Sequence, residues 1–368
     1  MATIHDVAHL AGVSKSLVSR YLNDQKGVSP ESTLKIIAAI KELNYRPNGI
    51  ARSLVLQKTH TIGIVVDDLC ATFIFRLIEG LERGAEDFDV DEKYNIIFCN
   101  SNGDVQRKQR HLNFLMNGRV DGIVLYGSLV YDDTMIQQLV HSNFPLMLIE
   151  NDIEGTDVNK VVIDNIGGAF MATEHLINLG HRRIAHIGGN MNLKITLDRM
   201  NGYVRALQRY NVPVDQSLII FPDFSDVDEW KKRDEFMSQN LYFDRGYVEM
   251  KKLIEKNQVP EAIFFATDLS AFGAIKAMNE VGLRVPEDVS VIGFDDEFRA
   301  AGSFNCKPVT TMMQPLKQAG YVGIQKLVYS LGHPHAAKER ILLNTELVVR
   351  ESTCANKRLA SAEQDTRV

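Results

Sequence analysis

Residues Val13–Asn23 read V-S-K-S-L-V-S-R-Y-L-N, and they follow a segment with the spacing of a short amphipathic helix. In that segment apolar residues recur at positions i, i+3, i+4 and i+7, namely Ile4, Val7, Ala8 and Ala11. Gly12 suits the left-handed conformation that ends a helix, and Ser14 can cap the helix that begins after it. A helix, a short turn with glycine and a second helix are typical of the helix-turn-helix motif.

Capping residues mark the other helix boundaries of this N-terminal head. Thr3 can cap the first helix, and Asp6 three residues later completes a capping box. Ser29 followed by Pro30 places a cap and then a proline at the first position of a third helix. We therefore expect an all-α helix-turn-helix domain over residues 1–46.

The second helix of such a domain enters the major groove and uses its N-terminal residues on base edges. Here these residues are Lys15 and Ser16, with Arg20 one turn later on the same side. Lysine and arginine suit the O6 and N7 atoms of guanine. Backbone amides at the helix start and the hydroxyl groups of Thr3, Ser14 and Ser19 suit phosphate oxygens. The alternative is that Lys15 and Arg20 are solvated surface charges.

The distribution of charge separates the head from the rest of the chain. The 368 residues carry a net charge of −6, yet residues 1–60 hold eight Lys/Arg and only four Asp/Glu. A basic head on an acidic body suits a DNA-binding module fused to a domain that avoids DNA. The overall composition, with 45% apolar and 24% charged residues, is ordinary for a soluble globular protein.

The four cysteines favour reduced thiols over a disulfide scaffold or a zinc site, because none forms a C-x-x-C pair: Cys70, Cys99, Cys306 and Cys354. No apolar run approaches the ~20 residues that span a bilayer, and the N-terminus lacks the pattern of a secretory signal. We therefore expect a cytoplasmic protein. Because the sequence has no catalytic or metal-binding motif, we expect that the protein is not an enzyme and that it holds no metal ion or cofactor.

A longer pattern within residues 3–54 has fixed spacing: T-I-H-D-V-A-x-x-A-G-V-S-x-x-x-V-S-R-x-L-N, then V-S-P-E-S-T, then L-N-Y-R-P-N-G-I-A-R-S-L. This series closely resembles the DNA-binding head of the lac repressor (LacI/GalR) family of bacterial transcription regulators. The resemblance implies that residues 47–60 contain a hinge that becomes helical when two copies meet on operator DNA. In that family the paired hinge helices lie in the minor groove and insert leucines into the central base step.

The hinge contacts that the resemblance implies fall on three residues. By position Leu54 is the inserted leucine, Ala51 lies on the facing side and Arg52 lies near phosphate. An eight-residue helix is unstable alone in water, and an apolar wedge can bend DNA into further contact with a protein. The alternative for Leu54 is an ordinary linker residue packed on the body. The remaining DNA contacts that we expect are Asn23 and Asn48.

From residue 61 onward short apolar runs alternate with helical stretches, which predicts parallel α/β sheets covered on both faces. The runs are Ile62–Val66, Ile96–Cys99, Gly122–Tyr126, Leu146–Ile149, Val161–Ile163, Ile184–Ile187, Ile263–Ala266 and Val289–Phe294. Helical patterns lie near residues 73–88, 104–117, 132–142, 166–179, 197–210, 244–257 and 270–281. About 290 residues are too many for one such sheet, so two lobes are expected.

Three stretches of the body, G-H-R-R-I-A-H-I-G-G, D-R-M-N-G-Y and V-P-E-D-V-S-V-I-G-F-D-D, resemble the effector domain of the same family. That domain is similar to the type I periplasmic sugar-binding proteins, in which three crossovers join two α/β lobes with a ligand between them. We therefore assign residues 61–350 to a two-lobed ligand-binding and dimerisation domain. Residues 351–368 are expected to form a disordered tail without leucine heptads, which favours a dimer over a tetramer.

Ligands of open α/β sheets bind beyond the carboxyl ends of the strands. This rule selects Asp67, Glu150, Thr267 and Asp295, together with the neighbours Asp68, Asp268 and Asp296. Arg199 begins the helix after the Gly188-Gly189 turn, and a guanidinium or a carboxylate can bind vicinal sugar hydroxyls. Two aromatic residues are candidates for stacking on the apolar face of a sugar, Phe73 and Phe221.

The resemblance implies that Arg199 of the R-x-x-G-Y motif and Asp295, the first aspartate of G-F-D-D, contact the sugar. The alternative for both residues is a salt bridge or a loop anchor. Members of the family often carry asparagine where this chain has Thr267, and Asp268 is equally suited to capping the following helix.

Residues 223–245 are longer than the corresponding family segment and hold the single tryptophan, Trp230. A surface helical insertion and a lid over the cleft, with Trp230 or Phe224 on the ligand, are both open.

These patterns predict a homodimeric DNA-binding transcription regulator, a repressor of carbohydrate-utilisation genes controlled by a sugar or sugar derivative between the lobes. Its expected partners are double-stranded operator DNA, a second copy of the chain and the carbohydrate effector. The alternative is a member of the family that is controlled mainly by a phosphorylated partner protein.

Overall fold

The computed structural model describes residues 2–22, 26–46, 58–69, 74–87, 93–127, 129–130, 133–224, 241–297, 301–302 and 306–356. The chain divides into two compact units, residues 1–59 and residues 60–368. Several predicted contacts lie outside the described residues: Asn23, Asn48, Ala51, Arg52, Leu54, Phe73 and Trp230.

The head contains three helices whose ends carry the predicted caps: α1 (Ile4–Ala11), α2 (Lys15–Leu22) and α3 (Pro30–Glu42). The Thr3 hydroxyl accepts a hydrogen bond from the Asp6 amide, and the Asp6 carboxylate accepts one from the Thr3 amide, which completes the capping box. Gly12 ends α1 with φ of 64°. The three helices share a small apolar core formed by Val7, Ala8, Ala11, Val18, Ile36 and Ala39. The helix-turn-helix prediction is therefore confirmed in its elements and its caps.

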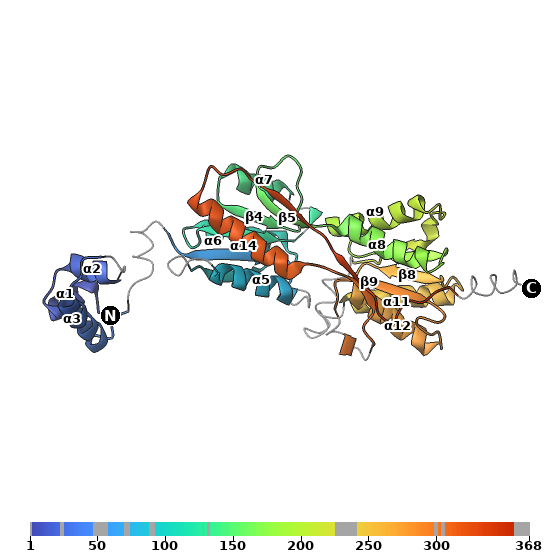
Figure 1. The fold of residues 1–368 in the computed structure, drawn as a ribbon, viewed down its shortest axis with the longest axis horizontal. Helices are drawn as coiled ribbons and strands as arrows, with labels where there is room; N and C mark the ends of the chain where they lie inside the picture. Colours follow the sequence, from blue (N-terminus) through green and yellow to red (C-terminus); the bar gives the residue numbers. More distant parts are fainter. Residues whose placement is uncertain are drawn as a thin grey trace, which may run out of the picture. The chain divides into compact units, whose positions relative to one another are not determined.

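Lobe 1 of the body is a six-stranded parallel sheet in the order β11-β5-β4-β3-β1-β2. Its strands are β1 (Thr61–Val66), β2 (Asn95–Asn100), β3 (Gly122–Tyr126), β4 (Leu146–Ile149), β5 (Asn159–Ile163) and β11 (Arg340–Leu343). One face packs against α5 (Ile74–Glu86) and α14 (Leu316–Gly332), and the other against α6 (Val105–Met116) and α7 (Asp133–His141) (Figure 1). Both faces are buried, which explains why the inner strands β1, β3 and β4 are almost wholly apolar.

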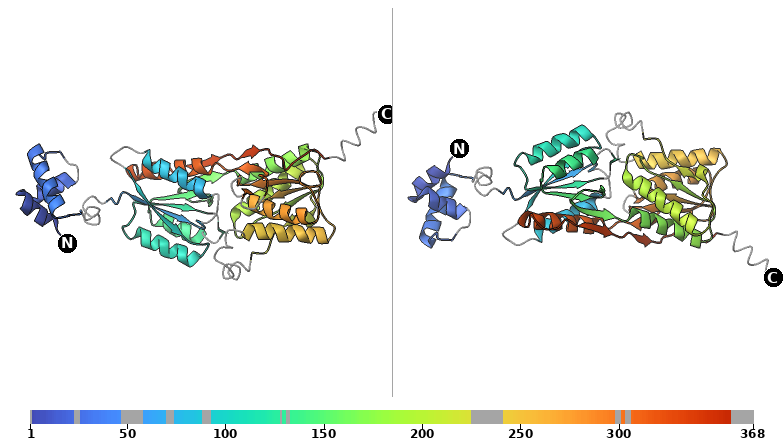
Figure 2. Two further views of the ribbon diagram at one scale, coloured as in Figure 1. Left: turned by 90° about the horizontal axis from the view of Figure 1, so that it is seen from below. Right: turned by 90° about the horizontal axis from the view of Figure 1, so that it is seen from above.

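Lobe 2 is a second six-stranded sheet in the order β12-β10-β9-β8-β6-β7, in which only β12 runs antiparallel to its neighbour. Its strands are β6 (Ile184–Ile187), β7 (Ile219–Ile220), β8 (Ala262–Phe265), β9 (Ser290–Phe294), β10 (Thr310–Met313) and β12 (Glu346–Val348). Helices α8 (Asn165–Asn178) and α9 (Lys194–Arg209) cover one face, and α11 (Leu241–Glu255) and α12 (Asp268–Glu280) cover the other (Figure 2). A short 3-10 helix, η2 (Gln216–Leu218), precedes β7.

The chain crosses between the lobes three times, as the resemblance implied. It passes from β5 to α8, returns from β10 to α14, and passes again from β11 to β12. The predicted two-lobed α/β arrangement is therefore confirmed, and neither lobe is a continuous piece of sequence.

The C-terminal part of the body contains elements that the apolar runs did not predict. Strands β7, β10, β11 and β12 are short or lie at a sheet edge, and α14 carries three glycines, which weaken a helical pattern. Two of these glycines have a packing role, because Gly320 lets α14 approach α5 and Gly323 lets it approach β4. A Cβ atom added at Gly80 of α5 would collide with the backbone carbonyl of Lys317 on α14.

The predicted disordered tail begins too early. The Val291 amide donates to the carbonyl of Ser352 over 2.7 Å, and the Ser352 hydroxyl accepts from the Thr310 amide over 2.7 Å. Farther along, the Asn356 side chain donates to Glu261. Residues 351–356 therefore pack against lobe 2, because their backbone and side chains pair with polar groups of β9, of β10 and of Glu261 before β8. Residues 357–368 lie outside the described part.

Candidate functional site

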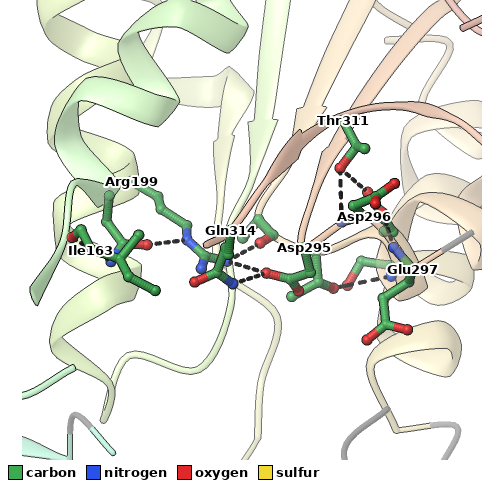
Figure 3. Close-up of polar contacts among 12 residues, drawn as sticks. Ile163, Arg199, Asp295, Asp296, Glu297, Thr311 and Gln314 are labelled. Atoms are coloured by element: carbon green, nitrogen blue, oxygen red, sulfur yellow. Dashed lines mark hydrogen bonds and ion pairs between the residues drawn. The ribbon is translucent and has the colours of Figure 1, made fainter. Parts of the chain in front are cut away.

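Arg199 of α9 is the most heavily bonded of the predicted site residues, and only 3% of its surface is exposed. Its Nε donates to Asn165 Oδ1 over 2.9 Å, and its Nη1 donates to the carbonyl of Ala266. Nη1 also lies 3.4 Å from Asp295 Oδ1, and the guanidinium carbon lies 3.7 Å from the centre of the Phe294 ring. Figure 3 shows the guanidinium directed toward Asp295 and Gln314. The remaining nitrogen, Nη2, is buried without a hydrogen-bond partner.

Asp295 follows β9 and faces Arg199 from a constrained backbone, with φ of 104°. Gln314, which follows β10, donates from Nε2 to Asp295 Oδ1 over 2.6 Å. Burial raises the pKa of Asp295 to about 6, and the positive charge of Arg199 opposes this shift. Burying the charge of Asp295 costs free energy, and so does its positive φ angle. Surrounding contacts must therefore hold the residue in place.

Glu150 approaches the same arginine from lobe 1 through a shared asparagine. It follows β4 with φ of 64°, and its Oε1 accepts from the Ile163 amide over 3.0 Å. Its Oε2 accepts from Asn165 Nδ2 over 3.3 Å, and the other end of Asn165 accepts from Arg199. Burial raises the pKa of Glu150 to about 7 despite the opposing charge of Arg199.

Asp67 is positioned at the end of β1 by a fully buried cation. Its Oδ1 lies 2.6 Å from the ammonium group of Lys108 on α6, and it accepts from the Ser101 hydroxyl over 3.0 Å. Its Oδ2 is buried without a hydrogen-bond partner. Gly127 leaves the space for this oxygen, because a Cβ atom there would collide with Oδ2.

Tyr126, the last residue of β3, lies close enough to the predicted side chains that their charges act on its hydroxyl group. Burial and the negative charges of Glu150, Asp295 and Asp67 raise its pKa well above the usual value, and the charge of Arg199 opposes the shift. Contributions from both lobes therefore converge on one phenol. Sequence reasoning missed Tyr126, although the rule of carboxyl strand ends could have found it.

Two further buried groups at strand ends were also missed. Asn151 Nδ2 follows β4, and Gln314 Oε1 follows β10; both are buried without a hydrogen-bond partner. Most buried polar atoms are paired with protein or water, so an unpaired one needs an explanation such as a bound molecule.

Two predicted ligand residues have structural roles in this arrangement. The Thr267 hydroxyl caps α12 by accepting from the Ser270 amide over 3.2 Å. The Phe221 ring is half-buried and contacts the edge of the His186 ring, with the centroids 6.4 Å apart. Asp268 does not cap its helix; its carboxylate accepts from the Glu297 amide and the Thr311 hydroxyl, each over 2.7 Å.

The predicted reading residues of the head lie on the exposed side of α2. Lys15, Ser16 and Arg20 are exposed, while Val18 of the same helix is fully buried. The Ser14 hydroxyl accepts from the Leu17 amide over 3.2 Å and lies 2.9 Å from the Ser16 hydroxyl. The start of α2 therefore presents a lysine and a capped helix end together, which suits an anion such as DNA phosphate.

Comparison with known proteins covers the head and both lobes. The model of bacterial regulatory proteins of the lacI family matches residues 3–48. The model of periplasmic binding proteins and sugar binding domain of the LacI family matches residues 59–240, and a periplasmic binding protein-like domain matches residues 173–353. The ribose operon repressor of Escherichia coli K12 is 33% identical over 352 residues, covering 96% of this chain and 100% of that protein. The chain belongs to the LacI family.

Solved structures agree with this membership. A lac repressor dimer bound to operator and the anti-inducer ONPF matches this LacI-family chain with a TM-score of 0.80 and 26% identity, covering 96% of this chain and 99% of that one. A complex of the transcriptional regulator CelR with cellobiose matches with a TM-score of 0.66 and 29% identity over 96% of this chain and 100% of that one. The predicted fold, a helix-turn-helix head with a two-lobed periplasmic-binding-protein-like body, is confirmed. The chain is a DNA-binding transcription regulator.

The described residues contain no helix long and apolar enough to cross a membrane. No group of three or more His, Cys, Asp or Glu side chains in this part of the chain is arranged to hold a metal ion.

The raised pKa of Glu150 leads to a prediction about stability and pH. Between the ordinary carboxyl pKa of 4.5 and about 7 the folded protein keeps a proton that the unfolded chain releases. The free energy of unfolding therefore falls as pH rises through this window. We expect Glu150→Gln to gain stability relative to the wild type over the same range, by on the order of 2–3 kcal/mol at pH 8.

Urea unfolding of the two proteins at pH 5 and pH 8 measures this difference. Glu339→Gln, the same change at an exposed position, is the control. A difference between Glu150→Gln and wild type that does not grow with pH contradicts the expectation.

Proposed function

We propose that this regulator is a cytoplasmic homodimeric repressor of carbohydrate-utilisation genes, and that a sugar or sugar derivative between its lobes controls operator affinity. The supporting observation is a set of four unpaired buried atoms, three on residues that follow strands and one on α9: Asp67 Oδ2, Asn151 Nδ2, Gln314 Oε1 and Arg199 Nη2. Two of them are acceptors and two are donors. A polyol matches such a mixture, because each hydroxyl both donates and accepts.

The relatives supply independent support for this class of effector. One is a ribose operon repressor, and one solved neighbour holds cellobiose. Both compounds are uncharged carbohydrates. The site of this chain also suits an uncharged ligand, because its two buried cations, Lys108 and Arg199, are already paired with Asp67 and Asp295 and leave no excess positive charge for an anion.

The proposed control works through the arrangement of the lobes. An effector that binds residues of both lobes favours the arrangement in which those residues are close. The change reaches the head through residues 47–60, which we propose as a hinge between a DNA-binding domain at 1–46 and the effector domain at 61–350. Coupling of this kind is typically ~1–3 kcal/mol, and it acts equally in both directions.

The proposed dimer involves the free edge of lobe 1. Strand β2 is an outer strand of the sheet, and 36% of Ile97 is exposed on it. On the neighbouring helix α5, Phe75 is 63% exposed. An unpaired apolar edge is a template for association, and a symmetric partner would cover it. Two heads would then read a pseudo-palindromic operator.

Replacing Arg20 tests the reading helix. We expect Arg20→Ala to weaken binding to an operator selected from random duplexes by ~10–100-fold, because a good arginine–guanine pair is worth about 1–3 kcal/mol. Fluorescence anisotropy measures the affinity. Lys41→Ala, which removes an equal charge from α3, should cost much less. Equal losses in the two variants would mean that Arg20 contributes only charge.

Replacing Arg199 tests the cleft. Arg199→Lys keeps the positive charge but removes Nη2, so carbohydrate affinity should fall at least ~10-fold, equivalent to about 1.4 kcal/mol. A thermal-shift screen over mono- and disaccharides measures it, since a ligand at 100 times its dissociation constant stabilises by ~2.7 kcal/mol. Arg209→Lys, on an exposed part of α9, is the control.

An unchanged shift in Arg199→Lys contradicts the cleft assignment. A wild-type protein that ignores every carbohydrate but responds to a phosphorylated protein supports the alternative form of control.

Replacing Ile97 tests the dimer surface. We expect Ile97→Lys to raise the dimer dissociation constant at least ~10-fold, because a charge on an edge strand opposes pairing. Sedimentation velocity measures the dissociation constant, with Val281→Lys as the control at an exposed apolar position in lobe 2. A dimer that is equally stable in both variants places the interface elsewhere.

A further inference from the structure

The turn after β9 combines two adjacent residues in an unfavourable backbone conformation. Asp295 has φ of 104° and Asp296 has φ of 58°, and neither is glycine. Side chains with a Cβ atom rarely occupy this region, and they stay there only where several surrounding contacts force them to do so. The contacts around this turn should therefore show what keeps it in place.

Within lobe 2 every amide of the turn has an acceptor (Figure 3). The bonds are Asp295 N to Met312 O over 2.9 Å, Asp296 N to Thr311 Oγ1 over 3.3 Å and Glu297 N to Asp268 Oδ2 over 2.7 Å. The Asp296 carboxylate also forms an ion pair with Arg350 just after β12. These contacts hold the amide side of the turn and one carboxylate oxygen.

The other side of the turn is held from lobe 1. Arg76 of α5 donates from Nη2 to the backbone carbonyl of Asp296 over 2.8 Å and to its Oδ2 over 2.8 Å. The arginine side chain is 29% exposed and the aspartate side chain 8% exposed, so the pair is largely shielded from water. A charged donor on a carbonyl orients the peptide group, which an ion pair to the carboxylate alone would not do.

We propose that Arg76 is a positioning residue that clamps the 295–296 turn of lobe 2 from lobe 1. By fixing the peptide between Asp296 and Glu297, together with the Asp296 side chain, Arg76 holds the turn in which the Asp295 carboxylate is directed toward Arg199. The clamp forms only when the lobes are in the arrangement described here. Its consequence for the effector rests on the proposed function, whereas the clamp itself does not.

Through this clamp, effector affinity depends on how the two lobes are placed relative to each other. Arg76 exerts this effect without having to touch the effector. When the lobes separate, Arg76 leaves and Arg350 remains. The carbonyl of Asp296 then loses its charged donor, and the turn relaxes toward an ordinary conformation. The Asp295 carboxylate loses its fixed direction in the same step.

Hydrogen exchange on the full chain, without any carbohydrate, tests the clamp. We expect Arg76→Met to speed exchange of the amides at 295–297 by ~10-fold or more, because the turn opens more often. Arg83→Met is the matched control, since Arg83 lies on the same helix and its side chain is 64% exposed. Equal exchange at 295–297 in the two variants overturns the proposal.

A conservative variant covers the case in which Arg76→Met folds poorly. Arg76→Lys keeps the charge and a donor but not the geometry of the guanidinium group. Its amide exchange rate at 295–297 should therefore lie between the rates of the wild type and of Arg76→Met. Unchanged exchange in distant strands of both lobes shows that a variant is folded. If Arg76→Lys is folded and its exchange at 295–297 equals that of the wild type, charge alone suffices and the orienting role is rejected.

Binding measurements separate the clamp from the proposed function. Calorimetric titrations with D-ribose and with cellobiose should show affinity at least ~10-fold weaker in Arg76→Met than in Arg83→Met. Equal affinities reject the link from the clamp to the effector. If neither sugar binds the wild type, the proposed function fails for these two sugars, and the exchange result still decides whether the clamp exists.

Discussion

A buried guanidinium group that cannot lose its proton governs the arrangement of the candidate site. Arginine stays charged at any pH that a folded protein tolerates, so its burial requires acceptors from its surroundings. Arg199 finds them on Asn165, Ala266 and Asp295, and it stacks on Phe294. These partners come from α8 and from the ends of β8 and β9, so one cation ties together the carboxyl edge of the lobe 2 sheet.

Much of the fold followed from the alternation of apolar runs and helical periodicity, because the buried strands are continuous stretches such as Thr61–Val66. The pattern failed near the C-terminus for physical reasons. Gly320 and Gly323 look like helix breakers, but they are the contacts that let α14 approach its neighbours closely. Strand β7 has only two residues and β11 is half exposed, so neither produces a clear apolar signal.

The candidate site was predictable where a side chain directly follows a strand, as Asp67, Glu150 and Asp295 do. It was not predictable where the role depends on three-dimensional neighbours. Nothing in the sequence distinguishes Lys108 from the solvated cations of an ordinary helix, yet it is fully buried against Asp67. Thr267 shows the converse, because its position after a strand suggested ligand contact while its hydroxyl caps α12.

The three crossings of the chain affect the order in which the molecule is made. The sheet of lobe 1 lacks β11 until residue 343 has been synthesised, and lobe 2 lacks β12 until residue 348. The head needs only the first 42 residues for its three helices. At ~5–20 residues per second roughly 300 further residues take about 15–60 s. The three helices of the DNA-binding head are therefore synthesised well before either lobe of the body is complete.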